Sequence, residues 1–162
     1  ETLDFLRGVE ATPRVAVLWS GRREGPERAA LEAQGAALGI APVTRFLGHV
    51  PDPAAAYRAL DLFALSSDTE QMPFSVLEAM GSGLAVASTD VGDVRVMLAP
   101  ENAALVTGRD EAALAAGLRT LLADAARRAR LGAANRARAE AEFDEALMAR
   151  RHAALWRGEA LP

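Results

Sequence analysis

Short apolar runs alternate with longer stretches of helical spacing along most of this chain, and this alternation limits the possible folds more than any other feature. The runs are four or five residues long and bounded by Gly, Pro, Asp or Ser, as is typical of strands buried on both faces. They occupy residues 15–19, 43–47, 62–65, 84–87 and 103–106. Helices are predicted between them at 27–38, 53–60, 73–82 and 94–98. The alternation predicts an α/β fold, a doubly wound, Rossmann-like parallel sheet with helices on both faces.

The pattern changes after residue 106. Leucines then recur at helical spacing without further strand-like runs, in a sequence rich in Ala, Arg and Glu. Asp110 is placed to cap the first of these helices, with Glu111 in its first turn. We therefore expect a C-terminal tail of two or three helices. No Pro-, Gly- or Ser-rich linker divides the chain, so residues 1–162 are expected to form a single domain.

Composition excludes several classes of protein. The net charge of −4 argues against a domain that coats nucleic acid. No run of about 18 apolar residues is present, so no transmembrane segment is expected, and residues 1–10 lack the pattern of a signal peptide. The chain has no cysteine, and His49 and His152 have no partner at ligand spacing, so no metal site is expected. No cofactor is expected either. These features predict a cytoplasmic protein.

The candidate site lies in the loop that follows the third apolar run. In open parallel sheets ligands bind beyond the carboxyl ends of the strands, and the most polar of the loops there is 66–73. Pro73 suits the first position of a helix, because its missing donor is not needed there. The N–H groups of Phe74, Ser75 and Val76 would then be unpaired at the positive end of the helix dipole. The sequence therefore predicts a phosphate site at this helix start.

Two carboxylates accompany this helix start. Glu70 precedes it, and Glu78 lies one to two turns inside the helix, from where its side chain leans back toward the N-terminus. Their separation along the axis is roughly 8 Å, so both acids are expected to flank one anion pocket. A nucleotide-sugar, with a pyrophosphate between two sugars whose hydroxyls donate to carboxylates, fits that layout. On their own, Glu70 and Glu78 are better explained as surface acids, and the surrounding sequence favours the site.

That surrounding sequence resembles a known family. The matching segments are 46–48, 59–63, 66–67, Glu70, Pro73, 78–80, Gly83 and 89–92, with 25–28 and 38–40 upstream and 110–151 downstream. Together they closely resemble the C-terminal domain of the group 1 (GT4-type) glycosyltransferases, which have the GT-B fold. Glu70 and Glu78 match the Glu-x7-Glu motif of that family. The resemblance covers nearly the whole chain.

The resemblance implies a role for each site residue. Glu70 matches the acid that contacts the hydroxyls of the donor sugar and is the candidate catalytic residue, and Glu78 matches the acid that binds the ribose hydroxyls. Arg45 and Gly48 match the turn where the nucleobase packs. The loop whose main chain lines the sugar and the phosphates is matched by Met72, Pro73, Phe74 and Ser75. Family members retain the anomeric configuration and use nucleoside-diphosphate sugars without a bound metal.

The chain also departs from the family pattern. Gln71, Ser66, Ala85 and Asp93 stand where Gly, Pro, Pro and a second Gly are common, which leaves the donor's identity open. The family's pyrophosphate-binding Arg and Lys belong to a loop that would precede residues 2–7. The acceptor site and the catalytic His of many relatives belong to an N-terminal domain. We expect the first strand of this domain, that loop and the N-terminal domain all to be missing here.

The expected function is therefore donor binding within a longer, retaining glycosyltransferase, and this chain alone is expected to be inactive. Its expected partners are the donor, its own N-terminal domain and a lipid or glycan acceptor. A lipid acceptor would bring the protein to the periphery of the inner membrane through the missing domain. Two alternatives remain open: a non-catalytic interaction module derived from a glycosyltransferase, and a GT-B epimerase or phosphorylase.

Overall fold

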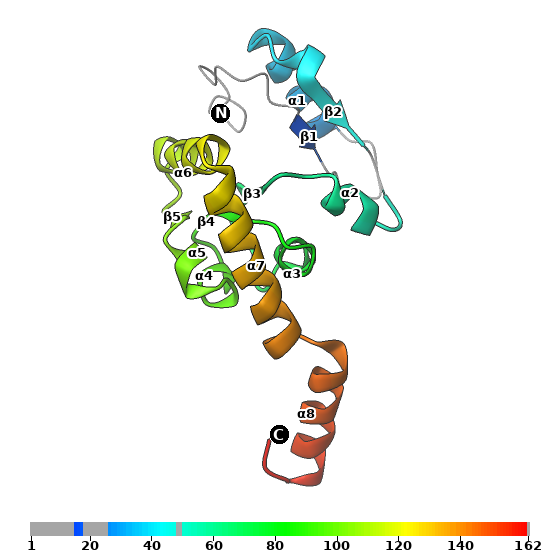
Figure 1. Cartoon of the computed structure of the whole chain (residues 1–162). Helices are drawn as coiled ribbons and strands as arrows, with labels where there is room; N and C mark the ends of the chain where they lie inside the picture. Colours follow the sequence, from blue (N-terminus) through cyan, green and yellow to red (C-terminus); the bar gives the residue numbers. More distant parts are fainter. Residues whose placement is uncertain (1–14, 18–25, 48–49, 162) are drawn as a thin grey trace.

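The computed structural model describes residues 15–17, 26–47 and 50–161, in which strands and helices alternate as predicted up to β5 (Figure 1). The strands are β1 (Val15–Val17), β2 (Thr44–Phe46), β3 (Phe63–Leu65), β4 (Val86–Thr89) and β5 (Val106–Thr107). The helices are α1 (Pro26–Ala37), the 3-10 helix η2 (Ala41–Val43), α2 (Ala54–Arg58), α3 (Phe74–Gly81), α4 (Val94–Met97), α5 (Pro100–Ala103), α6 (Glu111–Ala123), α7 (Ala125–Glu142) and α8 (Glu145–Arg157). The end of the first predicted strand, at 18–19, lies outside the described residues.

The strands pair in parallel, as predicted. β1 pairs with β2, and β4 lies between β3 and β5. Within the described ranges these pairings form two sheets, with no hydrogen-bonded pairing between β2 and β3, where the sequence predicts one continuous sheet. β2 and β3 are each three residues long, so each offers few backbone groups to a further neighbour.

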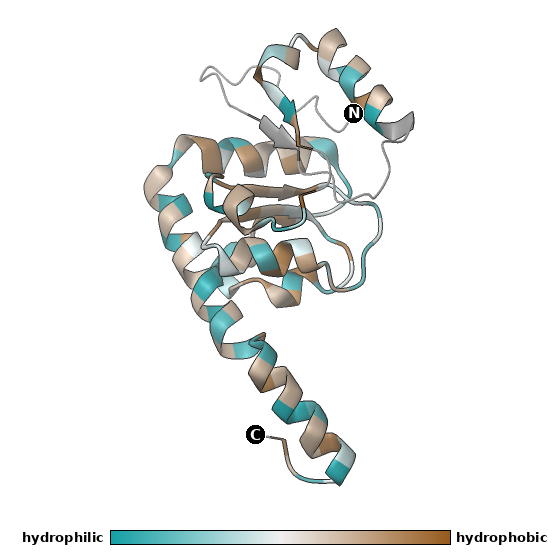
Figure 2. Cartoon of the chain, turned by 90° about the vertical axis from the view of Figure 1, so that its right-hand side faces the viewer, coloured by the Kyte–Doolittle hydropathy of each residue, from teal (hydrophilic) through white to brown (hydrophobic). Residues whose placement is uncertain are grey.

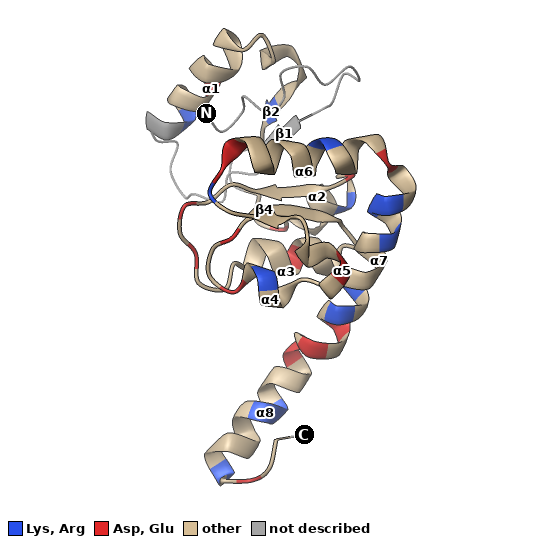
Figure 3. Ribbon diagram, turned by 90° about the vertical axis from the view of Figure 1, so that its left-hand side faces the viewer, with Lys and Arg blue, Asp and Glu red and all other residues tan. Residues whose placement is uncertain are grey.

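Helices cover both faces of the three-stranded sheet. α6 lies on one side of β4, and α3 and α4 lie on the other (Figure 3). Val86 of β4 packs in a cluster with apolar residues of α3 and α4, whereas Ala85 and Ala87 pack in a second cluster with leucines of α6 and α7. Apolar residues are concentrated in the strands between these helical layers (Figure 2). The predicted fold class, with its helices on both faces, is confirmed.

The fifth predicted strand, at 103–106, was wrong for most of its length. Helix α5 occupies Pro100–Ala103 instead, and β5 begins only at Val106. Pro100 stands at the helix start, where its fixed φ and its missing donor are compatible with a helix. Ala103 then donates a backbone hydrogen bond to Ala99 at 3.0 Å. The alanine-rich run at 103–106 has the composition of an apolar strand, but Pro100 and the hydrogen bond from Ala103 to Ala99 favour a helical turn.

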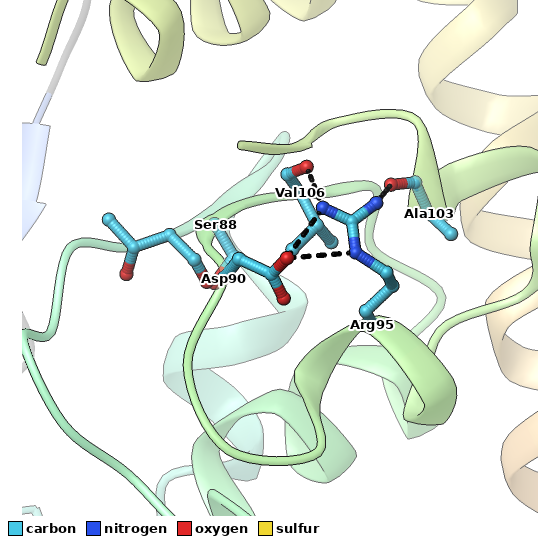
Figure 4. Close-up of polar contacts among 6 residues, drawn as sticks. Ser88, Asp90, Arg95, Ala103 and Val106 are labelled. Atoms are coloured by element: carbon cyan, nitrogen blue, oxygen red, sulfur yellow. Dashed lines mark hydrogen bonds and ion pairs between the residues drawn. The ribbon is translucent and has the colours of Figure 1, made fainter. Parts of the chain in front are cut away.

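Arg95 of α4 ties the short strand β5 to the loop after β4 (Figure 4). Its Nε and Nη2 donate to Asp90 Oδ2 at 3.0 and 2.8 Å. The guanidinium also donates to the carbonyls of Val106, at 2.7 Å, and Ala103, at 3.1 Å. Arg95 therefore satisfies carbonyl groups at the edge of the sheet, where a two-residue strand provides few partners.

Two asparagines form a buried polar network at the start of β4, and both are 0% exposed. Asn102 Oδ1 accepts from the amide of Val86 at 3.0 Å, and Asn102 Nδ2 donates to the carbonyl of Val86 at 2.6 Å. Asn135 of α7 donates to Asn102 Oδ1 at 2.7 Å and to the carbonyl of Leu84 at 2.9 Å, and accepts from the amide of Ala99 at 3.1 Å. The Asn102 side chain thus pairs with both backbone groups of Val86, as the backbone of a neighbouring strand would.

Helix α7 approaches the end of α3 with backbone against backbone. Gly83, just beyond α3, has a φ of +75°, in the left-handed region that favours glycine. A Cβ atom on Gly132 of α7 would lie 2.0 Å from the carbonyl oxygen of Gly83. Glycine at 132 is therefore required for α7 to pack this closely.

Three helices follow β5, in agreement with the predicted tail of two or three. Each begins at an aspartate whose side chain accepts a backbone hydrogen bond from the first turn: Asp110, Asp124 and Asp144. The predicted cap at Asp110 is confirmed. The last helix, α8, extends away from the body of the molecule (Figure 1), and its buried residue is Ala154. Among helices of the described residues, none is both long and apolar enough to cross a membrane.

Candidate functional site

The loop 66–73, which follows β3, is held by the loops after β4 and β5. Thr89 Oγ1 donates to the carbonyl of Ser67 at 2.7 Å. The amide of Asp93 donates to the carbonyl of Gln71 at 2.7 Å. Arg109 Nη1 makes a longer hydrogen bond of 3.3 Å to the carbonyl of Asp68. The carboxyl ends of all three strands of this sheet therefore contribute to one polar region, as the sequence predicts.

Gly92 brings two of these loops into contact. Its φ is +49°, and an added Cβ would lie 1.9 Å from the carbonyl oxygen of Gln71 and 2.8 Å from that of Glu70. No other residue type has both the backbone freedom and the space that this position requires. The backbone on either side of Glu70 is thus fixed by the loop after β4.

Helix α3 begins one residue later than predicted. Pro73 is the residue before the first helical turn, with an extended ψ of 117°, and Phe74 is the first helical residue. The amide of Val76 donates to the carbonyl of Pro73 at 3.0 Å, so one of the three predicted phosphate donors is already used. The amides of Phe74 and Ser75 remain at the positive end of the helix. Pro73 is buried, whereas the side chain of Phe74 is 78% exposed.

Glu70 lines an open depression of about 230 Å³ at this end of the sheet. Its other lining residues are Asp68, Thr69, Asp90, Val91, Gly92 and Arg109. The carboxylate of Glu70 is oriented by Ser67, whose Oγ donates to Oε1 at 2.8 Å. Acidic residues mark the loops at this end (Figure 3), and the charge of Asp90 is balanced by Arg95. Within the described ranges no group of three or more His, Asp or Glu side chains is placed to hold a metal ion.

Glu78 lines a second depression, of about 240 Å³, together with Tyr57, Ser82 and residues 52–54. Burial, together with the hydrogen-bonding tendency and the charge of the neighbouring Glu78 carboxylate, raises the pKa of Tyr57 well above its usual range. The two depressions share no lining residue. The sequence predicts one pocket flanked by both acids, but Glu78 faces Tyr57 of α2 and so lines a different depression from Glu70.

The remaining predicted site residues lie in several places. Met72 is 42% exposed in the loop before α3, and Ser75 is half-buried in the first turn of α3. Arg45 is exposed on β2, where it donates to the carbonyls of Pro42 and Thr44 at 3.4 and 3.3 Å. It lines neither depression. Gly48, its predicted neighbour at the nucleobase, lies outside the described residues.

Comparison with known proteins identifies the family. A family model described as glycosyl transferases group 1 matches residues 4–124. The chain belongs to this family. Two solved structures have the same fold as this group 1 glycosyltransferase domain. Sucrose-phosphate synthase from Thermosynechococcus elongatus matches with a TM-score of 0.80 at 26% identity, covering 90% of this chain and 38% of that one. The C-terminal domain of a glycosyl transferase group 1 family protein (LpcC) from Francisella tularensis matches with a TM-score of 0.66 at 25% identity, covering 77% and 66%.

Curated relatives are also glycosyltransferases. A D-inositol 3-phosphate glycosyltransferase of Geodermatophilus obscurus is 40% identical over 96 residues, which are 57% of this chain and 21% of that protein. The lipopolysaccharide core biosynthesis glycosyltransferase LpsD of Rhizobium meliloti is 32% identical over 123 residues, which are 75% of this chain and 36% of that protein. The group 1 glycosyltransferase domain thus spans between about a fifth and a third of the curated relatives it matches. It is a C-terminal domain of the GT-B fold.

Several residues at the site of this glycosyltransferase domain were not predicted, among them Tyr57, Arg109 and Thr89. Tyr57 lies on α2, a helix distant in sequence from the polar loop, and its helical spacing alone indicates a core residue. Arg109 follows β5. The sequence singled out the loop 66–73 because it is the most polar of the loops at the carboxyl ends of the strands, and Arg109 belongs to another of these loops. Thr89 belongs to a segment that matches the family, but its contact with the polar loop was not predicted, because this hydrogen bond joins it to Ser67 in a different loop.

Proposed function

We propose that this chain binds the nucleoside-diphosphate-sugar donor of a glycosyltransferase that retains the anomeric configuration. The observation that supports this most strongly is that Glu70 and Glu78 line two separate depressions along one segment of chain, with the start of α3 between them in sequence. The proposed donor is elongated and carries a sugar at each end. Two acids in two depressions suit its two ends better than they suit a compact ligand.

Each part of the proposed donor has a chemical counterpart in the chain. Carboxylates accept hydrogen bonds from sugar hydroxyls, so Glu70 would hold the transferred sugar and Glu78 the ribose. The amides of Phe74 and Ser75, at the positive end of α3, would bind a phosphate oxygen. The retaining outcome and the nucleobase contact near Arg45 and Gly48 are supported by the family resemblance. The family resemblance implies that an Arg and a Lys of a loop preceding residues 2–7 would neutralise the pyrophosphate.

Calorimetric titration of the chain with UDP, GDP and ADP tests this proposal. We expect weak binding of at least one of them and no sugar transfer by the chain alone. Absence of binding to all three by a chain that remains folded would rule out the donor site. In the longer protein, detection of sugar transfer would separate the proposal from its alternatives, since an epimerase or a phosphorylase would give a different product and an interaction module would give none.

Replacement of Glu78 by alanine should weaken the binding of nucleoside diphosphate by about tenfold or more, because hydrogen bonds to a charged group are lost. Calorimetry of the Glu78→Ala variant measures the change. A matched control is Glu140→Ala, which removes an exposed helical glutamate that pairs with Arg136 and lines neither depression. Equal affinity of the wild-type and Glu78→Ala chains would disprove the ribose assignment.

Replacement of Glu70 by alanine should mainly affect recognition of the donor sugar. In the longer protein, we expect the Glu70→Ala variant to bind nucleoside diphosphate normally but to lose roughly tenfold in affinity for the nucleotide-sugar. The reason is that Glu70 and Glu78 line separate depressions. Competition binding with both ligands measures the difference. An equal loss for both ligands would contradict the division of roles between the two acids.

A further inference from the structure

Tyr57 is a buried aromatic residue that reaches the second depression. It lies on the five-residue helix α2 and is 4% exposed. Its ring packs against that of Phe63, with centroids 5.8 Å apart and a tilt of 51°. Tyr57 and Glu78 of α3 line this depression together, and the carboxylate is close enough to the tyrosine to raise its pKa. Tyr57 therefore links a core contact to an exposed carboxylate.

The packing of Tyr57 does not require its hydroxyl. A phenylalanine would make the same ring contact without burying a polar group, which is costly unless the group is hydrogen-bonded. Burial and the nearby Glu78 carboxylate raise the pKa of the tyrosine. Tyr57 therefore keeps its proton at ordinary pH values, so its hydroxyl is available as a donor beside the Glu78 carboxylate.

We propose that Tyr57 is a positioning residue whose hydroxyl holds the Glu78 carboxylate ready to accept hydrogen bonds from the ribose diol of the donor nucleotide. Glutamate is a flexible side chain, and Glu78 is exposed on the surface of α3. Ordering such a side chain on binding costs conformational entropy. This cost is smaller when a neighbouring residue already fixes the side chain in the unbound protein. An ionised carboxylate has about four acceptor positions, so one bond from Tyr57 leaves enough for two ribose hydroxyls.

This role rests on the proposed function, in particular on ribose binding by Glu78. The test is calorimetry of the wild-type and Tyr57→Phe chains with whichever of UDP, GDP and ADP binds most tightly, and with its 2′,3′-dideoxy counterpart. The variant keeps the ring and removes only the hydroxyl. We expect Tyr57→Phe to lose about tenfold in affinity for the ribonucleotide, because in this variant the Glu78 carboxylate must be ordered on binding. Its affinity for the dideoxynucleotide should not change.

A matched control separates positioning from packing. The Phe63→Leu variant removes the partner ring but keeps the Tyr57 hydroxyl, so its unfolding midpoint should fall while its ratio of ribonucleotide to dideoxynucleotide affinity stays that of the wild type. An equal loss for both nucleotides in Tyr57→Phe would show a structural effect and overturn the positioning role. Unchanged ribonucleotide affinity in that variant would overturn it as well.

Failure of the proposed function gives a different result. If the wild-type chain binds both nucleotides equally, or if Glu78→Ala binds the ribonucleotide as well as the wild type does, Glu78 does not bind the ribose diol and the role of Tyr57 fails with it. If those two measurements agree with ribose binding and only Tyr57→Phe shows no diol-dependent loss, the proposed function stands and the positioning role alone is wrong. A further loss from Tyr57→Phe in a Glu78→Ala background would also overturn it, since Tyr57 acts through that carboxylate.

Discussion

Replacement of Gly132 by alanine should lower the free energy of unfolding by about 3 kcal/mol or more. The added Cβ would lie 2.0 Å from the carbonyl oxygen of Gly83 and 2.8 Å from its carbonyl carbon. Backbone atoms cannot rotate out of the way as a flexible side chain can, so α7 would have to move away from the end of α3. That movement would also pull Asn135, one turn further along α7, from its hydrogen bond to Leu84.

Urea denaturation of the wild-type and Gly132→Ala chains measures this loss as a lower midpoint. Gly81→Ala is the matched control, since Gly81 is also helical and an added Cβ there would have no atom within 4 Å. Alanine has the higher helix propensity, so this control should gain about 0.5–1 kcal/mol. A Gly132→Ala chain that is as stable as the control would refute the close packing of α7 on Gly83.

Replacement of Gly92 by alanine should lower the free energy of unfolding by about 3 kcal/mol and should also abolish the donor binding proposed above. Both the positive φ and the 1.9 Å approach to Gln71 oppose a side chain at this position. The loop that carries Glu70 would be displaced, and the hydrogen bond from the amide of Asp93 to Gln71 would be broken. Stability and ligand affinity should therefore fall together.

The Gly39→Ala variant separates the effect of a positive φ from the effect of the close approach to Gln71. Gly39 has a φ of +72°, yet an added Cβ there would have no atom within 4 Å. This control should lose only about 1 kcal/mol, from the left-handed backbone alone, and should bind nucleotide-sugar normally. Denaturation and calorimetry on both variants make the comparison. If Gly92→Ala costs no more than Gly39→Ala, the contact between the two loops is not needed for stability.

The fold class followed from local pattern. Short runs such as 62–65 and the helix at 73–82 appear in the structure within one or two residues of their predicted bounds, because a strand buried on both faces leaves a distinct apolar signature. The run at 103–106 was mistaken because alanine suits a helix as well as an apolar strand, and Pro100 favours the helix. The break between β2 and β3 depends on which strands meet in space, which no short window of sequence records.

The candidate site was predicted in part. Local rules located the polar loop and Glu70 at the carboxyl end of β3, and the family resemblance singled out Glu78. The separation of the two acids into different depressions was missed, because it depends on Tyr57 of α2, 21 residues before Glu78 in the chain. The hydrogen bond from Thr89 to Ser67 spans 22 residues and was missed for the same reason. Local sequence windows do not show such contacts.

The asparagine network also determines how the second half of the chain can fold. Within the described residues, the carbonyl of Leu84 and the amide of Ala99 are both hydrogen-bonded to the side chain of Asn135, which lies 51 and 36 residues further along the chain. Until α7 docks, the backbone groups just before β4 and α5 lack this partner, which is unfavourable wherever packing of the sheet removes them from water. An intermediate that contains this sheet but lacks α7 is therefore destabilised. The second half of the domain should consequently form as one cooperative unit, in which closure of a 51-residue loop is the entropic barrier.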